Sequence, residues 1–359
     1  HQSSVGRQGN TFPSSESTGG LNSLFSLHML DATTGWALSD QAVLRTSDGG
    51  IHWKNVTPSK ATPTQNSVAD FQTAYIAWIA IPKANTTTTQ VLHTADGGQT
   101  WQQTTIPAAL PRQITFVDSQ HGWILAGLRP PGGAAESVSV FRTIDGGKTW
   151  MNVATALFAD ATPPGHLPYG GQKLGIRFLN DATGWVSGTV SLPDLAWLYI
   201  THDGGSTWHQ QLLPLPPGVP STRLSILSPT FFSTTDGILP VIFSNVGTDS
   251  GIATDIYVTH DGGRTWQSTA LLSAALRILN FVDMQHGWAT DGMTLYSTRD
   301  GGDSWIKLSP SENFKNIVQL DFVSGEMGWA IRSTAPNSSS LLKTDDGGHT
   351  WTAVSSTTS

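Results

Sequence analysis

The residues most able to do chemistry are seven aspartates that recur within one short motif. The motif reads Thr, any residue, Asp, Gly, Gly, any residue, then Thr, Ser or His, and Trp; its aspartates are Asp48, Asp96, Asp145, Asp203, Asp261, Asp300 and Asp346. Aspartates at fixed positions could bind metal ions or act as acids and bases. A calcium loop, however, needs several acidic positions followed by a distant Glu. Each motif here has one required Asp and no Glu, so we predict a structural role and no metal.

The motif has the composition of a tight turn between two strands. The Thr ends one strand, and the Asp side chain can accept backbone N–H hydrogen bonds in an Asx-type turn. The two glycines can adopt positive φ angles, which strain other residues. The Trp opens the next strand and supplies a large apolar face between neighbouring repeats.

Other catalytic patterns are weaker. A glycosidase needs two carboxylates roughly 5–10 Å apart across a cleft, and no spacing pairs the candidates in the predicted loops. Those candidates are Asp40, Glu136, Asp160, Asp194, Asp249, Asp255 and Asp291. The 11 histidines are scattered without metal-ligand spacing, and cysteine is absent. We therefore predict no catalytic residue, no metal and no cofactor.

A second landmark precedes each Asp motif: an apolar residue, then a turn that ends in Gly-Trp. Clear copies are Asp31–Trp36, Phe116–Trp123, Phe178–Trp185, Phe281–Trp288 and Phe322–Trp329. Degenerate copies are Val68–Tyr75 and Phe231–Ile238. Within residues 110–155, strands are predicted at 113–117, 123–126, 137–143 and 149–153. Four short strands per ~40–50 residues are typical of a propeller blade.

The sequence therefore predicts an all-β fold: a seven-bladed β-propeller of four-stranded antiparallel blades, with an Asp motif in each turn between the third and fourth strands. Residues 1–20 are polar and Gly/Ser-rich, so we expect a flexible linker there. Residues 21–359 form a single propeller, whose approximate blades are 21–57, 58–105, 106–155, 156–213, 214–270, 271–309 and 310–359.

In a four-stranded meander, the Asp motifs share one face of the ring with the turns between first and second strands. The other face, called here the loop face, carries the connections of variable length. Variable loops on a rigid scaffold commonly carry binding. The candidate contact surface is thus the loop face of blades 3 to 5, with Arg129, His166, Tyr169, Arg177, Asp194, Trp197 and Arg223 as candidate ligand- or partner-binding residues. Ordinary core packing is the alternative for Trp197.

The residue before each landmark is polar, which predicts a row of side chains along a central water-filled channel. The predicted row is His28, Ser67, Thr115, Arg177, Thr230, Asn280 and Asp321. A separate hypothesis gathers Arg112, Arg177, Arg223 and Arg277 around the channel mouth.

Composition limits the partners. The net charge of −7 argues against nucleic acid and anionic membranes, and no apolar run is long enough to span a bilayer. A polar segment ahead of a compact domain suits an exported, extracellular or cell-surface protein, for which that linker is a candidate tether. We expect a monomer that recognises a protein or a glycan.

The repeats resemble the BNR, or Asp-box, repeats of sialidases, sortilin-type receptors, xyloglucan hydrolases and photosystem II assembly factors. The combination of Gly-Trp landmark and T-x-D-G-G-x-T-W box looks most like the assembly-factor group, which implies a non-enzymatic scaffold. The Arg-Ile-Pro segment typical of sialidases is missing. The alternative function is a glycoside hydrolase or carbohydrate-binding protein of sialidase-like fold.

Overall fold

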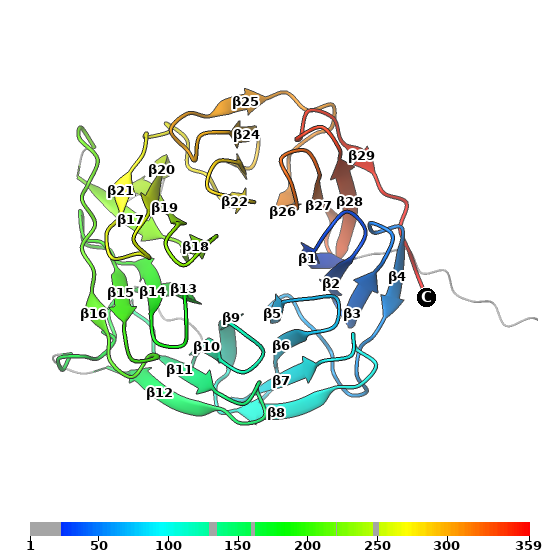
Figure 1. Ribbon diagram of the computed structural model, residues 1–359, viewed down its shortest axis with the longest axis horizontal. Coiled ribbons are helices and arrows are strands. Elements are labelled where there is room, and N and C mark those ends of the chain that lie inside the picture. Colours follow the sequence, from blue (N-terminus) through cyan, green and yellow to red (C-terminus); the bar gives the residue numbers. More distant parts are fainter. Residues whose placement is uncertain (1–22, 129–134, 159–161, 220, 247–250) are drawn as a thin grey trace, which may run out of the picture.

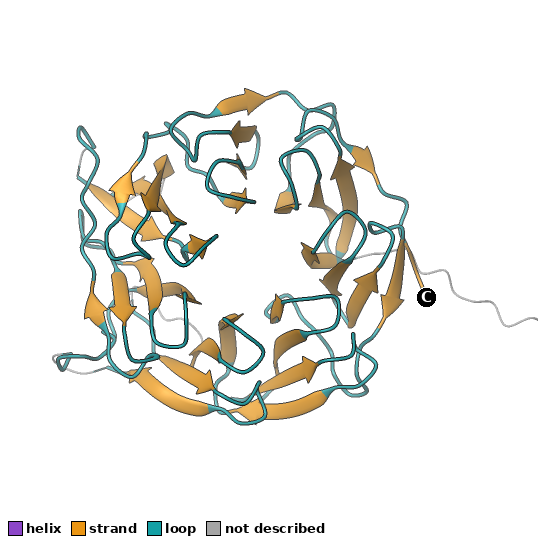
Figure 2. Ribbon diagram, viewed as in Figure 1, coloured by secondary structure: helices purple, strands orange, loops and turns teal. Residues whose placement is uncertain are grey.

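The computed structural model describes residues 23–128, 135–158, 162–219, 221–246 and 251–359. These residues form strands and loops and contain no helix (Figure 2). The described part of the chain thus has no helix with the length and apolar character needed to cross a membrane. The predicted linker at 1–20 lies outside the described residues.

Four of the sheets contain four antiparallel strands each. Their strands are β5 (Val68–Phe71), β6 (Ala77–Pro82), β7 (Thr89–Thr94) and β8 (Gln102–Ile106); β9 (Leu110–Phe116), β10 (Gly122–Gly127), β11 (Val138–Thr143) and β12 (Met151–Ala156); β22 (Ile278–Phe281), β23 (Gly287–Thr290), β24 (Leu295–Thr298) and β25 (Ile306–Leu308); β26 (Ile317–Phe322), β27 (Gly328–Ala335), β28 (Ser338–Thr344) and β29 (Thr352–Ala353).

Two further sheets depart from this pattern. The first sheet contains β1 (Leu24–Met29), β2 (Gly35–Ser39), β3 (Ala42–Thr46) and β4 (His52–Asn55), with β30 (Thr357–Thr358) paired parallel to β4. The other sheet has nine strands. They are β13 (Gln172–Phe178), β14 (Gly184–Thr189), β15 (Leu198–Thr201), β16 (His209–Gln210), β17 (Thr222–Ile226), β18 (Thr230–Phe231), β19 (Gly237–Asn245), β20 (Gly251–Thr259) and β21 (Gln267–Ser268).

The sheets are arranged around a central axis, and the strands nearest to it are β1, β5, β9, β13, β18, β22 and β26 (Figure 1). Hydrogen bonding groups the described strands into six sheets. The predicted seven separate blades are therefore not observed as seven separate sheets. The fourth and fifth predicted units are merged, since Thr189 at the end of β14 pairs with Ser225 of β17. All-β architecture built from four-stranded antiparallel units is observed.

Each Asp motif closes its turn through the same hydrogen bonds. In the first copy, the Thr46 hydroxyl donates to Asp48 Oδ1 at 2.9 Å, and the backbone N–H of His52 donates to the same oxygen at 2.9 Å. Gly49 and Gly50 have φ angles of 77° and 94°, which side chains with a Cβ rarely adopt. The turn also contacts the β1–β2 turn, where Thr33 O accepts the Gly49 N–H at 2.8 Å. Both turns therefore lie on one face.

The landmark tryptophans join each unit to the next. Trp78 stacks on Phe116 with ring centroids 3.7 Å apart, and its indole N–H donates to Gly146 O of the next Asp motif at 2.8 Å. Trp123 and Trp288 make the same contacts with their following units. Trp329, in the last sheet, donates to Gly49 O of the first at 3.0 Å. These buried indoles supply the inter-sheet core.

Trp78 corrects the predicted landmark of the second repeat. Phe71 pairs with Ala77 and Asp70 pairs with Trp78, as Phe116 pairs with Gly122 and Thr115 with Trp123. The landmark is therefore Phe71–Trp78 rather than Val68–Tyr75, and the channel-row residue is Asp70 rather than Ser67. Ala77 replaces the usual Gly, which hid the repeat.

The ends of the described chain meet through side chains as well as strands. Leu27 N–H donates to Gln319 Oε1 at 2.8 Å, and Met29 N–H donates to Asp321 Oδ2 at 2.5 Å, so β1 is tied to β26. On the outside, Asn55 N–H donates to Ser359 O at 3.0 Å, beside the β30–β4 pairing.

Candidate binding site on the loop face

A buried carboxylate organises the loop face next to β9. Glu136 is 3% exposed and accepts two hydrogen bonds at Oε1 from Arg112, from Nε at 3.0 Å and from Nη2 at 2.5 Å. A buried charge is costly unless it is paired and hydrogen-bonded. The pairing therefore fixes the end of the β10–β11 connection against the start of β9.

Lys173 continues this arrangement into the following unit. It is 2% exposed, and its ammonium donates to the backbone oxygens of Tyr169 at 2.7 Å, Gly171 at 2.9 Å and Glu136 at 3.0 Å. The ammonium also lies 5.1 Å from the ring centroid of Trp197. Burial lowers the pKa of Lys173 to about 8, and the charge of Glu136 opposes this shift.

Two more connections are joined to the contacts of Arg112, Glu136 and Lys173, called here the Lys173 framework. The Trp197 indole N–H donates to Gly170 O at 2.9 Å, which joins the β14–β15 connection to the β12–β13 connection. Asp194 has a φ angle of 59° and accepts hydrogen bonds from the Ser221 hydroxyl at 2.9 Å and the Thr222 N–H at 3.0 Å. Contacts of side chains thus link four successive loop-face connections.

The structure brings some predicted contact residues together and separates others. Tyr169 and Trp197 belong to the Lys173 framework; Trp197 is 3% exposed, so it supports this surface from within the core. His166 lines a separate hollow with Asn152–Thr155 and Ser206. Arg223 is half-buried in β17. Arg129 lies outside the described residues.

Several of the described acidic candidates accept hydrogen bonds from residues around them. Besides Glu136 and Asp194, buried Asp255 accepts from the Ser268 hydroxyl at 2.5 Å and the Thr269 N–H at 3.2 Å, and burial raises its pKa. Asp291 accepts from Met293 N–H at 2.9 Å and Thr294 N–H at 2.7 Å. Asp40 is half-buried, and Asp160 and Asp249 lie outside the described residues.

A cavity of about 770 Å³ lies on the channel side of this framework, between β1, β5, β9 and β13. Its lining includes His28, Asp70, Arg112, Gln113, Leu174 and Arg177. Of the four arginines predicted to gather at the channel mouth, Arg112 and Arg177 line this cavity, whereas Arg223 and Arg277 are not part of its lining.

Charged groups of the cavity interact across neighbouring strands. Burial lowers the pKa of His28, but the hydrogen bond and charge of Asp321, together with the charge of Asp70, outweigh that effect and leave the pKa raised. His28 Nδ1 lies 3.7 Å from Asp321 Oδ1. Burial also raises the pKa of Asp70, although the positive charges of Arg177 and His28 act to lower it. Sequence reasoning missed Asp70, and the Phe-to-Trp spacing is the signal that would have found it.

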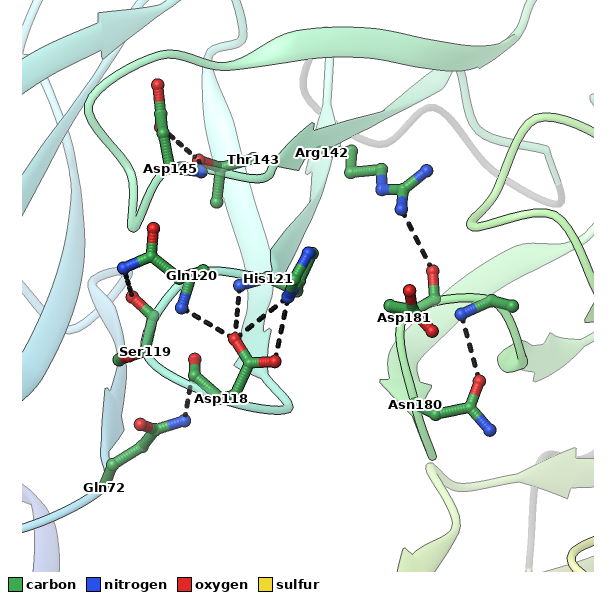
Figure 3. Close-up of polar contacts among 11 residues, drawn as sticks. Gln72, Asp118, Ser119, Gln120, His121, Arg142, Thr143, Asp145, Asn180 and Asp181 are labelled. Atoms are coloured by element: carbon green, nitrogen blue, oxygen red, sulfur yellow. Dashed lines mark hydrogen bonds and ion pairs between the residues drawn. The ribbon is translucent and has the colours of Figure 1, made fainter.

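The opposite, Asp-motif face holds short-range structural contacts (Figure 3). Asp118 accepts the backbone N–H groups of Gln120 and His121 at 2.7 and 2.8 Å, and His121 Nδ1 lies 2.8 Å from Asp118 Oδ2. Arg142 donates to Asp181 O of the next unit at 3.1 Å. Within the described residues, no three His, Asp or Glu side chains are arranged to bind a metal ion.

Comparison with protein families agrees with the repeat geometry. Residues 21–156 match the family model of the photosynthesis system II assembly factor YCF48, and residues 257–268 match the BNR/Asp-box repeat. The chain carries BNR/Asp-box repeats. Its BNR repeats resemble those of photosystem II assembly-factor-like proteins. No curated protein matches the sequence significantly.

Solved structures have a similar overall fold at low sequence identity. A GH74 xyloglucanase from Xanthomonas campestris superposes with a TM-score of 0.64 at 14% identity, over 95% of this chain and 55% of the enzyme. A PL25 ulvan lyase gives 0.51 at 10% identity, over 94% and 95%. PorZ, a surface component of the type-IX secretion system of Porphyromonas gingivalis, gives 0.50 at 11% identity, over 94% and 38%. The chain therefore spans about half of the xyloglucanase, and these identities show the fold alone.

Proposed function

We propose that this protein is a non-enzymatic binding or assembly scaffold that recognises a protein or glycan through its loop face. One observation carries the proposal: four successive loop-face connections are held together by Glu136, Lys173, Trp197 and Asp194. Binding to loops that are already ordered avoids part of the entropy cost of association. Such a surface suits recognition by a rigid platform.

The contact residues proposed on this platform are Tyr169, Asp194 and Arg223, with Trp197 as their buried support. Arg129 and His166 are also proposed as contact residues; His166 lines its own hollow with Ser206. Arg177 faces the channel cavity, where it would contact a ligand that enters from the loop face. The boxes are proposed to be structural, because their carboxylates accept hydrogen bonds within their own turns.

Two broader features complete the proposal. The nine-stranded sheet counts as two blades, since each half contains its own meander and its own Asp motif; on this count the propeller has seven blades. We also place the protein outside the cytoplasm, at the cell surface or free, as a monomer. The long polar N-terminal segment supports this placement.

Glycoside hydrolysis is the competing function. It needs one carboxylic acid and a second carboxylate that is free to act as base or nucleophile. The hydrogen bonds and ion pair of Glu136, Asp194, Asp255 and Asp291 favour the scaffold instead, because a carboxylate that fixes its own loop is poorly placed to exchange protons with a substrate.

The test compares one loop-face and one box-face substitution in partner capture. Crosslinking to a native envelope fraction is expected to recover the same partner with the wild type and with Arg299→Glu, whose side chain is exposed on the box face. Arg223→Glu is expected to lose it. A fluorogenic glycoside panel run in parallel addresses the competing function. Hydrolysis that disappears in Glu136→Gln or Asp194→Asn would overturn the scaffold.

A further inference from the structure

The channel cavity contains polar groups that have no hydrogen-bond partner among the described residues. Asp70 Oδ2 accepts the Phe116 N–H at 2.7 Å, while no described residue donates a hydrogen bond to its Oδ1. Within the described part of the chain, the Arg177 guanidinium makes no hydrogen bond or ion pair and acts on Asp70 and His28 only through longer-range electrostatics. A ligand could therefore find one acceptor and several donors in the same space.

Charges around the cavity offset one another. Arg112 is neutralised by Glu136, His28 faces Asp321, and Arg177 and Asp70 attract each other. A cavity with no excess charge gains little from an anionic or cationic ligand. Hydroxyl groups, which both donate and accept, suit a lining that presents a carboxylate beside a guanidinium and an amide.

Shape and apolar lining agree with this chemistry. The volume of about 770 Å³ lies within the ~300–1,000 Å³ typical of small-molecule sites. Phe25 and Leu174 line the same space and offer apolar surface for the C–H faces of a ring. The imidazole of His28, stacked on Phe71 with centroids 6.4 Å apart, adds a flat surface that is itself half-exposed.

We propose that this cavity binds a neutral, hydroxyl-rich sugar unit, with Asp70 and Arg177 as the groups that hydrogen-bond its hydroxyls. The inference rests on the proposed function, because it assigns a glycan ligand to the channel that opens within the loop-face scaffold. We expect the sugar to be bound and not cleaved, because hydrolysis needs a second carboxylate that is free to react. The carboxylate of Asp321 accepts the Met29 N–H and faces His28.

The variants can separate binding from folding. Asp70→Asn keeps an oxygen that can accept the Phe116 N–H, as Asn280 accepts the Phe322 N–H at 2.9 Å at the same row position in β22. Arg177→Gln removes the guanidinium. Asn280→Ser is the matched control, because it alters the same row outside the cavity lining.

Saturation-transfer NMR and calorimetry on the full chain would use glucose, galactose, xylose and cellobiose as neutral probes, with glucuronate and sialate as anionic ones. We expect at least one neutral probe to bind, at least tenfold weaker binding in Asp70→Asn and Arg177→Gln, and wild-type affinity in Asn280→Ser. Near-UV circular dichroism checks that each variant is folded. Absence of neutral-sugar binding, or preferential binding of the anions that only Arg177→Gln abolishes, would overturn the inference. If the sugar-binding inference fails but partner capture is still lost in Arg223→Glu, the proposed scaffold function remains supported.

Discussion

The two faces of this protein are built by opposite means. On the box face, one hydrogen-bond pattern recurs: the same Thr, Asp and Gly positions close the turn at 46–50 and at 143–147. On the loop face, Glu136, Lys173 and Asp194 each make contacts of a different kind. The repeated hydrogen bonds of the box face stabilise the ring of sheets. The loop-face contacts occur once each and order the loops of that surface. A substitution should therefore affect stability on the first face and recognition on the second.

The largest effect is expected from Trp123→Ala, which tests the repeated framework. Trp123 is fully buried, stacks on Phe178 at 3.6 Å and donates to Gly204 O at 2.9 Å. Its loss should lower the free energy of unfolding by about 3–5 kcal/mol, because a large cavity opens between two sheets. Urea unfolding followed by circular dichroism measures the change. A loss below about 1 kcal/mol would show that the indole does not hold the units together.

A smaller loss, coupled to a change in recognition, is expected from Lys173→Met. Removing the ammonium leaves the buried backbone carbonyls of Glu136, Tyr169 and Gly171 short of a hydrogen-bond donor, so the free energy of unfolding should fall by about 3 kcal/mol. The loop-face partner should also be lost, and Trp197 fluorescence should change. Lys148→Met, on the exposed box face, is the control and should alter neither property. Retained partner capture in Lys173→Met would break the proposed link between ordered loops and recognition.

The smallest effect concerns acid stability and the box carboxylates. Slight burial raises the pKa of Asp145, but hydrogen bonds from Thr149 and Thr143 outweigh this and lower it to about 2. A lowered folded-state pKa means that the stabilisation is present above the unfolded value of about 3.8 and is lost as the pH falls towards 2. Melting temperatures between pH 5 and 2 should fall, and less steeply in Asp145→Asn. An equal slope in both proteins would assign acid unfolding to other groups.

Much of the fold was predictable because its signals are local. Strands predicted at 113–117, 123–126, 137–143 and 149–153 correspond to β9–β12, with β9 starting three residues earlier. The Asp turn is specified within a few residues, so it can be recognised without tertiary information. The second repeat was misaligned because Ala77 takes the place of the landmark Gly, and only pairing with Phe71 shows the equivalence.

The loop-face site was less accessible to the same reasoning. Trp197 was a candidate contact, yet its ring lies in the core, where Gly170 of the β12–β13 connection and Lys173 of β13 contact it. The sequence suggested separate roles for Arg112 and Glu136. Their ion pair joins β9 to the β10–β11 connection, and spacing along the chain does not predict it.

By itself, the sequence determined the repeating unit: where the turns fall, which indoles are buried and which face carries the boxes. These follow from hydrogen bonds and φ angles that act within a few residues. Only the tertiary structure decided that two units merge into one sheet, that Asp70 and Arg177 share a cavity, and that Lys173 joins separate loops. Those contacts depend on how successive units are rotated and packed around the axis, which no short stretch of sequence encodes.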